Sequence, residues 1–360
     1  MSQIYKIIGV MSGTSLDGLD LAYCEFELKN DKWHYAIGAT QTIAYDQTWH
    51  TRLAELHKQP MFLLPKTDAY FGKYIGQSIR AFIKENNIAV DFIASHGHTI
   101  FHNPAEGYTT QIGSGAAIYA ETGIPTICDF RSVDVALGGQ GAPLVPIGDA
   151  LLFSEYDACL NLGGFANISF TTNEERLAFD ICPCNVLLND VAKQEGFAFD
   201  KDGKIAASGK VNQLLLDELN QLSFYSKQGA KSLGREWVEQ AIWPIVKKHQ
   251  ITLEDLMATF VEHIVVQIAA VLAKSNSFTL LTTGGGALNT FLMQRLEAHF
   301  GQKISSGSPQ LIQYKEALVF AFLGVLRFIG KVNSLCLVTD ATHDNIGGAI
   351  YGVYNPILTD

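Results

Sequence analysis

One pattern occurs twice in this 360-residue sequence: an apolar strand, a turn of small polar residues and a second strand. The first copy joins predicted strands at Ile4–Val10 and Leu19–Leu28 through the turn Met11–Gly18. The second copy joins Ala158–Leu162 to Asn167–Phe170 through another glycine turn. Apolar segments that flank a Gly-rich turn predict a β-hairpin. The second hairpin is a weak internal repeat of the first, at the level of pattern only. The length of 360 residues favours two domains, and strands that alternate with helices favour α/β layers.

A third glycine turn follows a predicted strand at Thr279–Thr283. Glycine lets backbone N–H groups converge on an anion without a Cβ in the way, and Ser or Thr hydroxyls add donors. Three such turns predict a nucleotide site, in which two hold the phosphates and one lies beside the base and ribose. One glycine turn alone is more often just a turn, so the prediction depends on their joint occurrence. The sequence has no P-loop motif and no G-x-G-x-x-G after a strand, which disfavours those two nucleotide folds.

The chain carries 26 basic and 36 acidic residues, a formal net charge of −10. This charge disfavours nucleic acid and anionic membranes as partners. The most apolar stretch, Ala317–Ile329, carries Arg327 and is too short to span a bilayer, so we expect a buried helix. The N-terminus reads into a strand rather than a signal peptide, and the six scattered cysteines are typical of free thiols. We therefore expect a soluble, cytoplasmic protein.

Two polar hairpins that grip a nucleotide, one from each domain, are the plan of the actin, sugar-kinase and chaperone-ATPase superfamily. The opening motif Gly9–Asp20, GVMSGTSLDGLD, is more specific and resembles the signature of the anhydro-N-acetylmuramic acid kinases. The resemblance continues in order along nearly the whole chain, through Ser95–Thr99, Asp129–Asp134, Gly138–Pro146, Asn161–Ile168, Lys231–Glu236, Gly284–Asn289 and Asp344–Tyr351.

The resemblance implies an α/β protein with the two-domain actin-like (ribonuclease-H-like) sugar kinase fold and an active-site cleft between the domains. We predict a first domain of residues 1–135 plus about 342–360, and a second of residues 136–341. The family opens the 1,6-anhydro ring of its sugar with water and phosphorylates it from ATP, giving N-acetylmuramic acid 6-phosphate for peptidoglycan recycling. The resemblance also implies a homodimer.

Asp180 follows the apolar run Leu177–Phe179, so we expect it to end a strand that faces the cleft. A carboxylate there could hold a water molecule and act as a base, or merely cap a turn. The family reads Asp-Thr-Gly-Pro-Gly-Asn here, and its Asp is the catalytic base. In this chain Ile181, Cys182 and Cys184 replace the Thr and both glycines. Because Cys does not freely adopt positive φ, the replacements put the shape of the loop in question. A redox or metal role for the two cysteines is disfavoured, because they lack the two-residue spacing and a Cys/His cluster.

Glu316 is expected to open the helix Glu316–Phe328, and it resembles the family's second acidic residue near the attacking water. The alternative is a charge that favours the helix dipole. Arg131 suits the lactyl carboxylate of the sugar through a bidentate pair; an ion pair with Asp129 or Asp134 is the alternative, and both can hold.

His98 and Thr99 are predicted to bind the sugar. His98 replaces a Gln of the family's Ser-His-Gly-Gln-Thr, and either side chain can donate a hydrogen bond. His96 and His102 lie close in sequence and raise a metal-site alternative, which the lack of an acidic cluster disfavours.

The predicted ATP-binding residues belong to the three turns: Gly9, Ser12, Gly13, Thr14, Ser15, Asp17, Asn161, Gly163, Gly164, Gly284, Gly285, Gly286 and Asn289. Mg²⁺ is expected because it bridges the β- and γ-phosphate oxygens in phosphoryl transfer. Asp17 and Asp20 are its candidate ligands, although either could instead pin the hairpin turn. Two further hypotheses stay open: a kinase for another anhydro sugar such as levoglucosan, and a nucleotide-binding homologue without catalysis.

Overall fold

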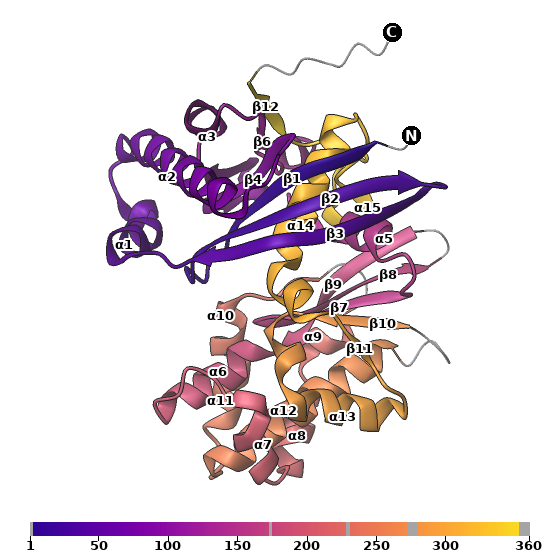
Figure 1. Cartoon of the computed structure of the whole chain (residues 1–360). Helices are drawn as coiled ribbons and strands as arrows, with labels where there is room; N and C mark the ends of the chain where they lie inside the picture. Colours follow the sequence, from indigo (N-terminus) through magenta and orange to yellow (C-terminus); the bar gives the residue numbers. More distant parts are fainter. Residues whose placement is uncertain (1–2, 173–174, 228–230, 273–278, 353–360) are drawn as a thin grey trace. The chain divides into compact units, whose positions relative to one another are not determined.

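The computed structural model describes residues 3–172, 175–227, 231–272 and 279–352. The chain forms two units, one of Met1–Leu152 with Tyr314–Asp360 and one of Phe153–Gln313. Each unit contains one mixed β-sheet with helices packed on it (Figure 1). The predicted α/β class is therefore confirmed.

The first unit orders its main strands β3-β2-β1-β4-β6, with β12 beyond β6 and β5 paired to β4. The strands β1, β2 and β3 form an antiparallel meander, and β4 and β6 continue the sheet in parallel with β1. Their bounds are β1 Ile4–Ser12, β2 Leu19–Lys29, β3 Lys32–Ile43, β4 Phe92–Asn103, β5 Tyr108–Ile112, β6 Thr126–Cys128 and β12 Ala349–Tyr351.

The second unit repeats this order as β9-β8-β7-β10-β11. Again three antiparallel strands are followed by two that run parallel to the first. Their bounds are β7 Ala158–Leu162, β8 Phe165–Thr172, β9 Glu175–Pro183, β10 Leu280–Thr283 and β11 Ser305–Ser306. The same five-strand order in both units is the duplicated ribonuclease-H-like arrangement that the family resemblance implied.

The helices of the first unit are α1 Gln47–Glu55, α2 Leu63–Asn86, α3 Gly115–Thr122, α4 Ser132–Ala136, α5 Val145–Leu152 and α15 Cys336–Thr339, joined by most of α14 Pro309–Phe328. Short 3₁₀ turns lie at η1 Leu56–Lys58 and η2 Pro104–Glu106. The second unit has α6 Asn185–Gln194, α7 Lys204–Ser208, α8 Gln213–Asn220, α9 Ser223–Ser226, α10 Arg235–Trp237, α11 Trp243–Val246, α12 Leu253–Leu272 and α13 Thr290–Phe300, with the turns η3 Lys201–Gly203 and η5 Gly285–Leu288 and a π-helical turn η4 Val238–Ile242.

The two faces of the first sheet bury different partners, because side chains alternate along a strand. Ile8 and Val10 of β1 belong to the same core cluster as Phe71 of α2. Between them, Gly9 faces α14 so closely that an added Cβ would lie 2.0 Å from the carbonyl oxygen of Ala317. The backbone of α14 therefore touches β1, and this contact requires glycine.

Several expected boundaries differ from the structure. The strand β3 and the helix α1 were not predicted, and α2 begins at Leu63 rather than Asp68. The helix α14 begins at Pro309, so Glu316 lies inside it and does not open it. The interpretation of Glu316 as a charge at a helix N-terminus was therefore wrong.

The unit boundaries also differ from the predicted domains. Residues 136–152 and 314–341 belong to the first unit. The C-terminal part of the chain therefore rejoins the first unit at Tyr314 rather than near residue 342. The reason is packing and hydrogen bonding: Gly9 contacts α14, and the Gln140 amide donates to the Thr339 carbonyl oxygen (2.6 Å). The predicted residues 353–360 lie outside the described residues.

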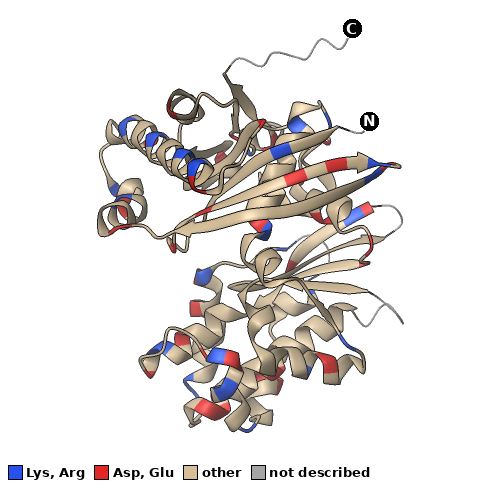
Figure 2. Cartoon of the chain, in the orientation of Figure 1, with Lys and Arg blue, Asp and Glu red and all other residues tan. Residues whose placement is uncertain are grey.

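The predicted buried helix is confirmed, because residues 317–323 of α14 are all buried. Among the described residues, α12 alone is long and apolar enough to cross a membrane, but 72% of its most apolar window is buried. That burial is the pattern of a core helix. Basic and acidic residues are interspersed on the helices of both units (Figure 2).

Candidate functional site

The hairpin tip of the first unit is held by a chain of side-chain hydrogen bonds. Tyr45 donates its hydroxyl to Ser12 Oγ (2.6 Å), and Ser12 Oγ lies 2.9 Å from His98 Nδ1. Ser12 is 1% exposed, and burial lowers the pKa of His98 to about 4. In the neutral imidazole of His98 one ring nitrogen donates and the other accepts, so either Ser12 Oγ or His98 Nδ1 is the donor in this contact. The Ser12 hydroxyl is thus engaged within the protein, which leaves its backbone for a predicted phosphate contact.

A β-bulge separates His96 from His98. In the pairing of β1 with β4, Val10 opposes Ser95 but Ser12 opposes His98, so β4 carries one extra residue. Gly97 there has φ of +73°. His96 consequently packs on Phe320 of α14 (4.6 Å between ring centroids) while His98 turns to Ser12. The bulge shows why these two histidines do not form the pair that their spacing suggests.

Arg131 lies against His96 rather than in the ion pair that its sequence neighbours suggested. Its Nε donates to His96 Nε2 (3.0 Å) and its Nη1 donates to the Gly141 carbonyl oxygen (2.5 Å). His96 Nδ1 therefore carries a proton and donates to the Gly97 carbonyl oxygen (2.9 Å). Burial lowers the pKa of Arg131 to about 10, and the charges of Glu316 and Asp134 oppose that shift. Burial also lowers the pKa of His96 to about 3, which keeps its imidazole neutral near pH 7.

Glu316 is accessible to solvent, yet surrounding protein atoms desolvate it enough to raise its pKa. The positive charge of Arg131 opposes that rise, and the negative charge of Asp20 adds to it. Arg131 and Glu316, predicted for the sugar and the attacking water, are thus close enough to influence each other. Because Glu316 is exposed, a ligand can reach this residue.

The candidate magnesium ligands lie at the start of β2. Thr42 donates to Asp20 Oδ1 (2.6 Å), and burial raises the pKa of Asp20, with a further rise from the charge of Asp17. Two carboxylates that repel each other fit a hard cation, which would relieve that repulsion. Asp20 also serves the fold through Thr42, whose hydroxyl lies 3.1 Å from the hydroxyl of Tyr314.

The hairpin tip of the second unit is held by backbone. The carbonyl oxygen of Gly164 accepts from the amides of Cys184 (2.8 Å) and Val186 (3.1 Å), and that of Gly163 accepts from Asn185 (3.1 Å). Asn185 also donates Nδ2 to the Leu162 carbonyl oxygen (2.9 Å). The start of α6 therefore fixes the carbonyl groups of this turn.

The third glycine turn lies beside the second. An added Cβ at Gly284, whose φ is +80°, would lie 2.5 Å from Asn161 Oδ1. One at Gly286 would lie 2.7 Å from Leu162 Cβ. Asn289 caps α13, because its Oδ1 accepts from the Leu292 amide (3.0 Å). The structure thus brings together the predicted ATP residues of this unit and gives Asn289 a structural role as well.

The glycines of the turns divide into two kinds. Gly9, Gly284 and Gly286 are required by contacts within the chain. At Gly13 an added Cβ would meet only Ser15 Oγ at 3.4 Å, and at Gly164 it would meet no described atom within 4 Å. Neither residue has a positive φ. Nothing within the described chain requires glycine at Gly13 or Gly164, and close approach of a ligand would explain both.

Asp180 lies near the end of β9, opposite Asn167 in the neighbouring strand. Leu233 donates its amide to Asp180 Oδ2 (2.8 Å), and the Asp180 amide donates to the Lys231 carbonyl oxygen (2.9 Å). Burial raises the pKa of Asp180, and the Leu233 bond opposes the rise. The segment of Lys231 and Leu233 therefore orients the carboxylate.

The side chain of Lys231 contacts two aromatic rings and a backbone carbonyl oxygen. Its Nζ lies 4.8 Å from the ring centroid of Phe224 and 5.7 Å from that of Phe179. It also donates to the Phe224 carbonyl oxygen (3.3 Å). The family resemblance covers this segment, but its residue types do not reveal the contact with Asp180.

The two cysteines of the Asp180 loop differ in backbone conformation. Cys182 lies within β9 and has no positive φ, and Cys184 has φ of −126°. Asn167 of β8 pairs with Asp180, but the neighbouring Ala166 pairs with Cys182. The strand β9 therefore has one extra residue, Ile181, which indicates a β-bulge after Asp180. Both cysteines are fully buried, and burial raises the pKa of the Cys184 thiol to about 12. Neither cysteine has a positive φ, but a ψ of −101° places Cys184 outside the main allowed regions for an L-residue. The effect of the replaced glycines on the shape of the loop therefore stays a prediction.

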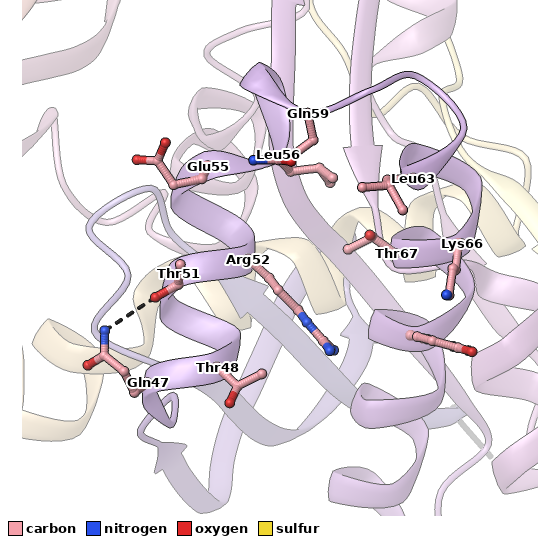
Figure 3. A pocket seen from close by; sticks show the side chains of 11 residues that line it. Gln47, Thr48, Thr51, Arg52, Glu55, Leu56, Gln59, Leu63, Lys66 and Thr67 are labelled. Carbon is pink, nitrogen blue, oxygen red and sulfur yellow. Dashed lines mark hydrogen bonds between the residues drawn. The ribbon is translucent and has the colours of Figure 1, made fainter.

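A separate pocket of about 560 Å³ lies in the first unit between α1 and α2. Figure 3 shows Arg52 extending from α1 towards α2, and Lys66 and Thr67 on the facing helix. None of the predicted site residues lines this pocket.

Thr99, a predicted sugar-binding residue, follows His98 in β4 and accepts a hydrogen bond from Gln111 Nε2 (3.3 Å).

The duplicated α/β topology, with a polar hairpin tip in each unit and a third glycine turn, is that of the actin-like superfamily, to which sugar kinases belong. The model of the family "anhydro-N-acetylmuramic acid kinase" matches residues 5–353. The chain belongs to the anhydro-N-acetylmuramic acid kinase family. The predicted family and its kinase class are thereby confirmed.

Relatives match over almost their whole length. The anhydro-N-acetylmuramic acid kinase of Sulfurimonas denitrificans is 35% identical and covers 98% of this chain and 100% of its own. That of Pseudomonas fluorescens is 37% identical and covers 96% and 98%. Similar solved structures are distant: component A of the (R)-2-hydroxyglutaryl-CoA dehydratase of Acidaminococcus fermentans is 14% identical, has a TM-score of 0.44, and covers 88% and 96%.

Proposed function

We propose that the protein is an ATP-dependent kinase that opens 1,6-anhydro-N-acetylmuramic acid with water and phosphorylates it to N-acetylmuramic acid 6-phosphate. Membership of the family supports the substrate class. The observation that carries the chemistry is Asp180, a half-buried carboxylate oriented by the Leu233 amide, whose pKa burial raises. A raised pKa makes a carboxylate a stronger base. The cytoplasm, peptidoglycan recycling, a homodimer and the cleft between the domains are parts of this proposal.

In the proposed reaction Asp180 accepts a proton from water. The water oxygen bonds to the anomeric carbon as the bond from that carbon to the bridging oxygen breaks. The bridging oxygen then bonds to the γ-phosphorus of ATP, whose bond to the β,γ-bridging oxygen breaks to release ADP. Glu316 would help to orient the water, and the phosphoryl acceptor replaces the general acid of a hydrolytic glycosidase.

The other predicted residues bind and orient the substrates. Arg131 would pair with the lactyl carboxylate, with His98 and Thr99 donating to the sugar. Gly13 and Gly164 would let backbone amides approach the phosphates. Asp17 and Asp20 fit Mg²⁺, which neutralises charge on the phosphates when bound.

The test is turnover of ATP, Mg²⁺ and 1,6-anhydro-N-acetylmuramic acid, with the product identified by mass. We expect a ring-opened 6-phosphate, a loss in kcat on the order of 10³-fold in Asp180→Asn, and full activity in the control Asp217→Asn, on an exposed position of α8. ATP binding without product from this sugar would refute the assignment. Product from levoglucosan alone would support the other anhydro-sugar hypothesis instead.

A further inference from the structure

Asp134 is a fully buried carboxylate in the first unit that the proposed chemistry does not use. It is 0% exposed and accepts four hydrogen bonds. A buried charge is costly unless it is fully hydrogen-bonded, so this concentration of donors requires an explanation.

The two oxygens of Asp134 have different partners. Oδ1 accepts from the hydroxyls of Ser334 (2.7 Å) and Thr339 (2.8 Å) and from Asn345 Nδ2 (2.9 Å). Oδ2 accepts from the amide of Gly141 (2.8 Å). One oxygen is therefore anchored by the segment of residues 334–345, and the other fixes the glycine loop of residues 138–141.

The carbonyl oxygen of Gly141 is the acceptor for Arg131 Nη1. Asp134 thus holds Gly141 by its amide, and Gly141 holds the guanidinium by its carbonyl oxygen. The loop has little room to move, since an added Cβ at Gly139 would lie 2.3 Å from Asp134 Oδ2. With Nε donating to His96 and Nη1 to Gly141, these contacts leave both hydrogens of Nη2 and the second hydrogen of Nη1 as donors.

We propose that Asp134 is a positioning residue for substrate recognition, which aims the Nη2 edge of Arg131 at the carboxylate of the sugar through Gly141. The side chain of Asp134 is itself held by donors 200 residues or more away along the chain, which are Ser334, Thr339 and Asn345. The inference rests on the proposed function for its substrate, but the geometry of Arg131 does not depend on turnover.

Asp134→Asn is the sharpest variant. The amide can keep an oxygen towards Ser334, Thr339 and Asn345, but its NH₂ group then faces the Gly141 amide, donor against donor. The variant therefore loses the hydrogen bond to Gly141 but keeps those to Oδ1. We expect KM for the anhydro sugar to rise about tenfold or more, because small displacements of a binding group have large effects, and KM for ATP to stay within about twofold, because the change acts through Arg131 alone.

A double-mutant cycle separates positioning from a merely structural role. If Asp134 acts through Arg131, Asp134→Asn adds nothing to the KM of Arg131→Ala. The matched control is Asp200→Asn in the second unit, where a buried carboxylate also accepts from backbone amides, of Ile205 (2.9 Å) and Ala206 (3.0 Å). We expect that variant to lower Tm without changing the sugar KM. Additive effects of Asp134→Asn and Arg131→Ala would overturn the proposal.

Two further measurements keep the test decisive. If Asp134→Asn does not fold, Thr339→Val removes one donor from Oδ1, and we expect a smaller rise in the sugar KM that is again absent in the Arg131→Ala background. The ¹⁵Nε–¹H resonance of Arg131, assigned with Arg131→Lys, needs no substrate. A shifted or broadened resonance in Asp134→Asn supports the proposal even if wild type turns over no anhydro sugar, and an unchanged resonance refutes it.

Discussion

The two hairpin tips share a topology and differ in what holds them. In the first unit, Ser12 is fixed by the side chains of Tyr45 and His98. In the second, Gly163 and Gly164 are fixed by backbone amides at the start of α6. Side-chain contacts depend on residue type and, for His98, on protonation, whereas amides donate in any sequence except at proline. The first tip is therefore expected to be more sensitive to substitution and to pH.

The largest expected effect separates structural from ligand-binding glycine. Gly9→Ala places a Cβ 2.0 Å from the Ala317 carbonyl oxygen, so β1 and α14 must move apart. We expect a loss of about 3 kcal/mol or more in the free energy of unfolding, measured by chemical denaturation. A stable Gly9→Ala variant would show that the contact with α14 is not rigid.

The second prediction concerns pH. His98 has a folded pKa of about 4, below its usual 6.5, so between these values the unfolded chain binds the extra proton. Its contribution to stability is therefore complete above pH 6.5 and is lost as pH falls towards 4. Between pH 6.5 and 4, we expect the free energy of unfolding to fall by about 3 kcal/mol less in His98→Gln than in wild type. Equal losses in the two proteins would contradict the neutral, buried His98.

A control for this measurement comes from the second unit. His263 is also buried there, and burial lowers its pKa to about 3. His263→Gln should likewise reduce the acid-induced loss, but it lies on α12 and outside the hairpin. Only His98→Gln should also change the hydrogen bonding at Ser12.

The third prediction applies to the open glycine of the second tip. An alanine Cβ at Gly164 would meet no described atom within 4 Å. We expect Gly164→Ala to change the free energy of unfolding by less than about 0.5 kcal/mol and to raise KM for ATP about tenfold if the phosphates approach this turn. An unchanged KM would remove Gly164 from the predicted nucleotide site.

Sequence patterns predicted the parts of the fold that repeat. The two hairpins followed from alternating apolar residues around glycine turns, and both are present in β1–β2 and β7–β8. The strand β3 was not predicted, although Trp33, Tyr35, Ile37 and Ala39 alternate with polar residues as in a half-buried strand. This signal was present in the sequence and was overlooked. The earlier start of α14 was also overlooked, although Ser308 before Pro309 is a helix-start signal and Leu311, Tyr314 and Leu318 share a buried face.

The candidate site shows a similar limit. Residue types and the family resemblance singled out Asp180 and Arg131, but not what orients them. The Leu233 amide and the Gly141 carbonyl oxygen are backbone groups, whose positions follow from tertiary structure and not from residue type. The backbone of the Asp180 loop is a further example, because residue type does not reveal the φ of −126° and ψ of −101° at Cys184.

The smallest expected effects compare the two tips directly. Tyr45→Phe removes one donor to Ser12, and Asn185→Ala removes one donor to the Leu162 carbonyl oxygen. Each loss should cost about 1 kcal/mol in the free energy of unfolding.

Local mobility should distinguish these two variants where stability does not. The Leu16 amide, which donates to the Gly13 carbonyl oxygen (3.2 Å), should exchange faster with solvent in Tyr45→Phe, because its turn has lost a brace. The Cys184 amide should stay protected in Asn185→Ala, because its bond to Gly164 is independent of the Asn185 side chain. Hydrogen exchange followed by mass spectrometry measures both. Faster exchange at Cys184 would mean that the second tip also depends on a side chain, and the contrast between the two units would fail.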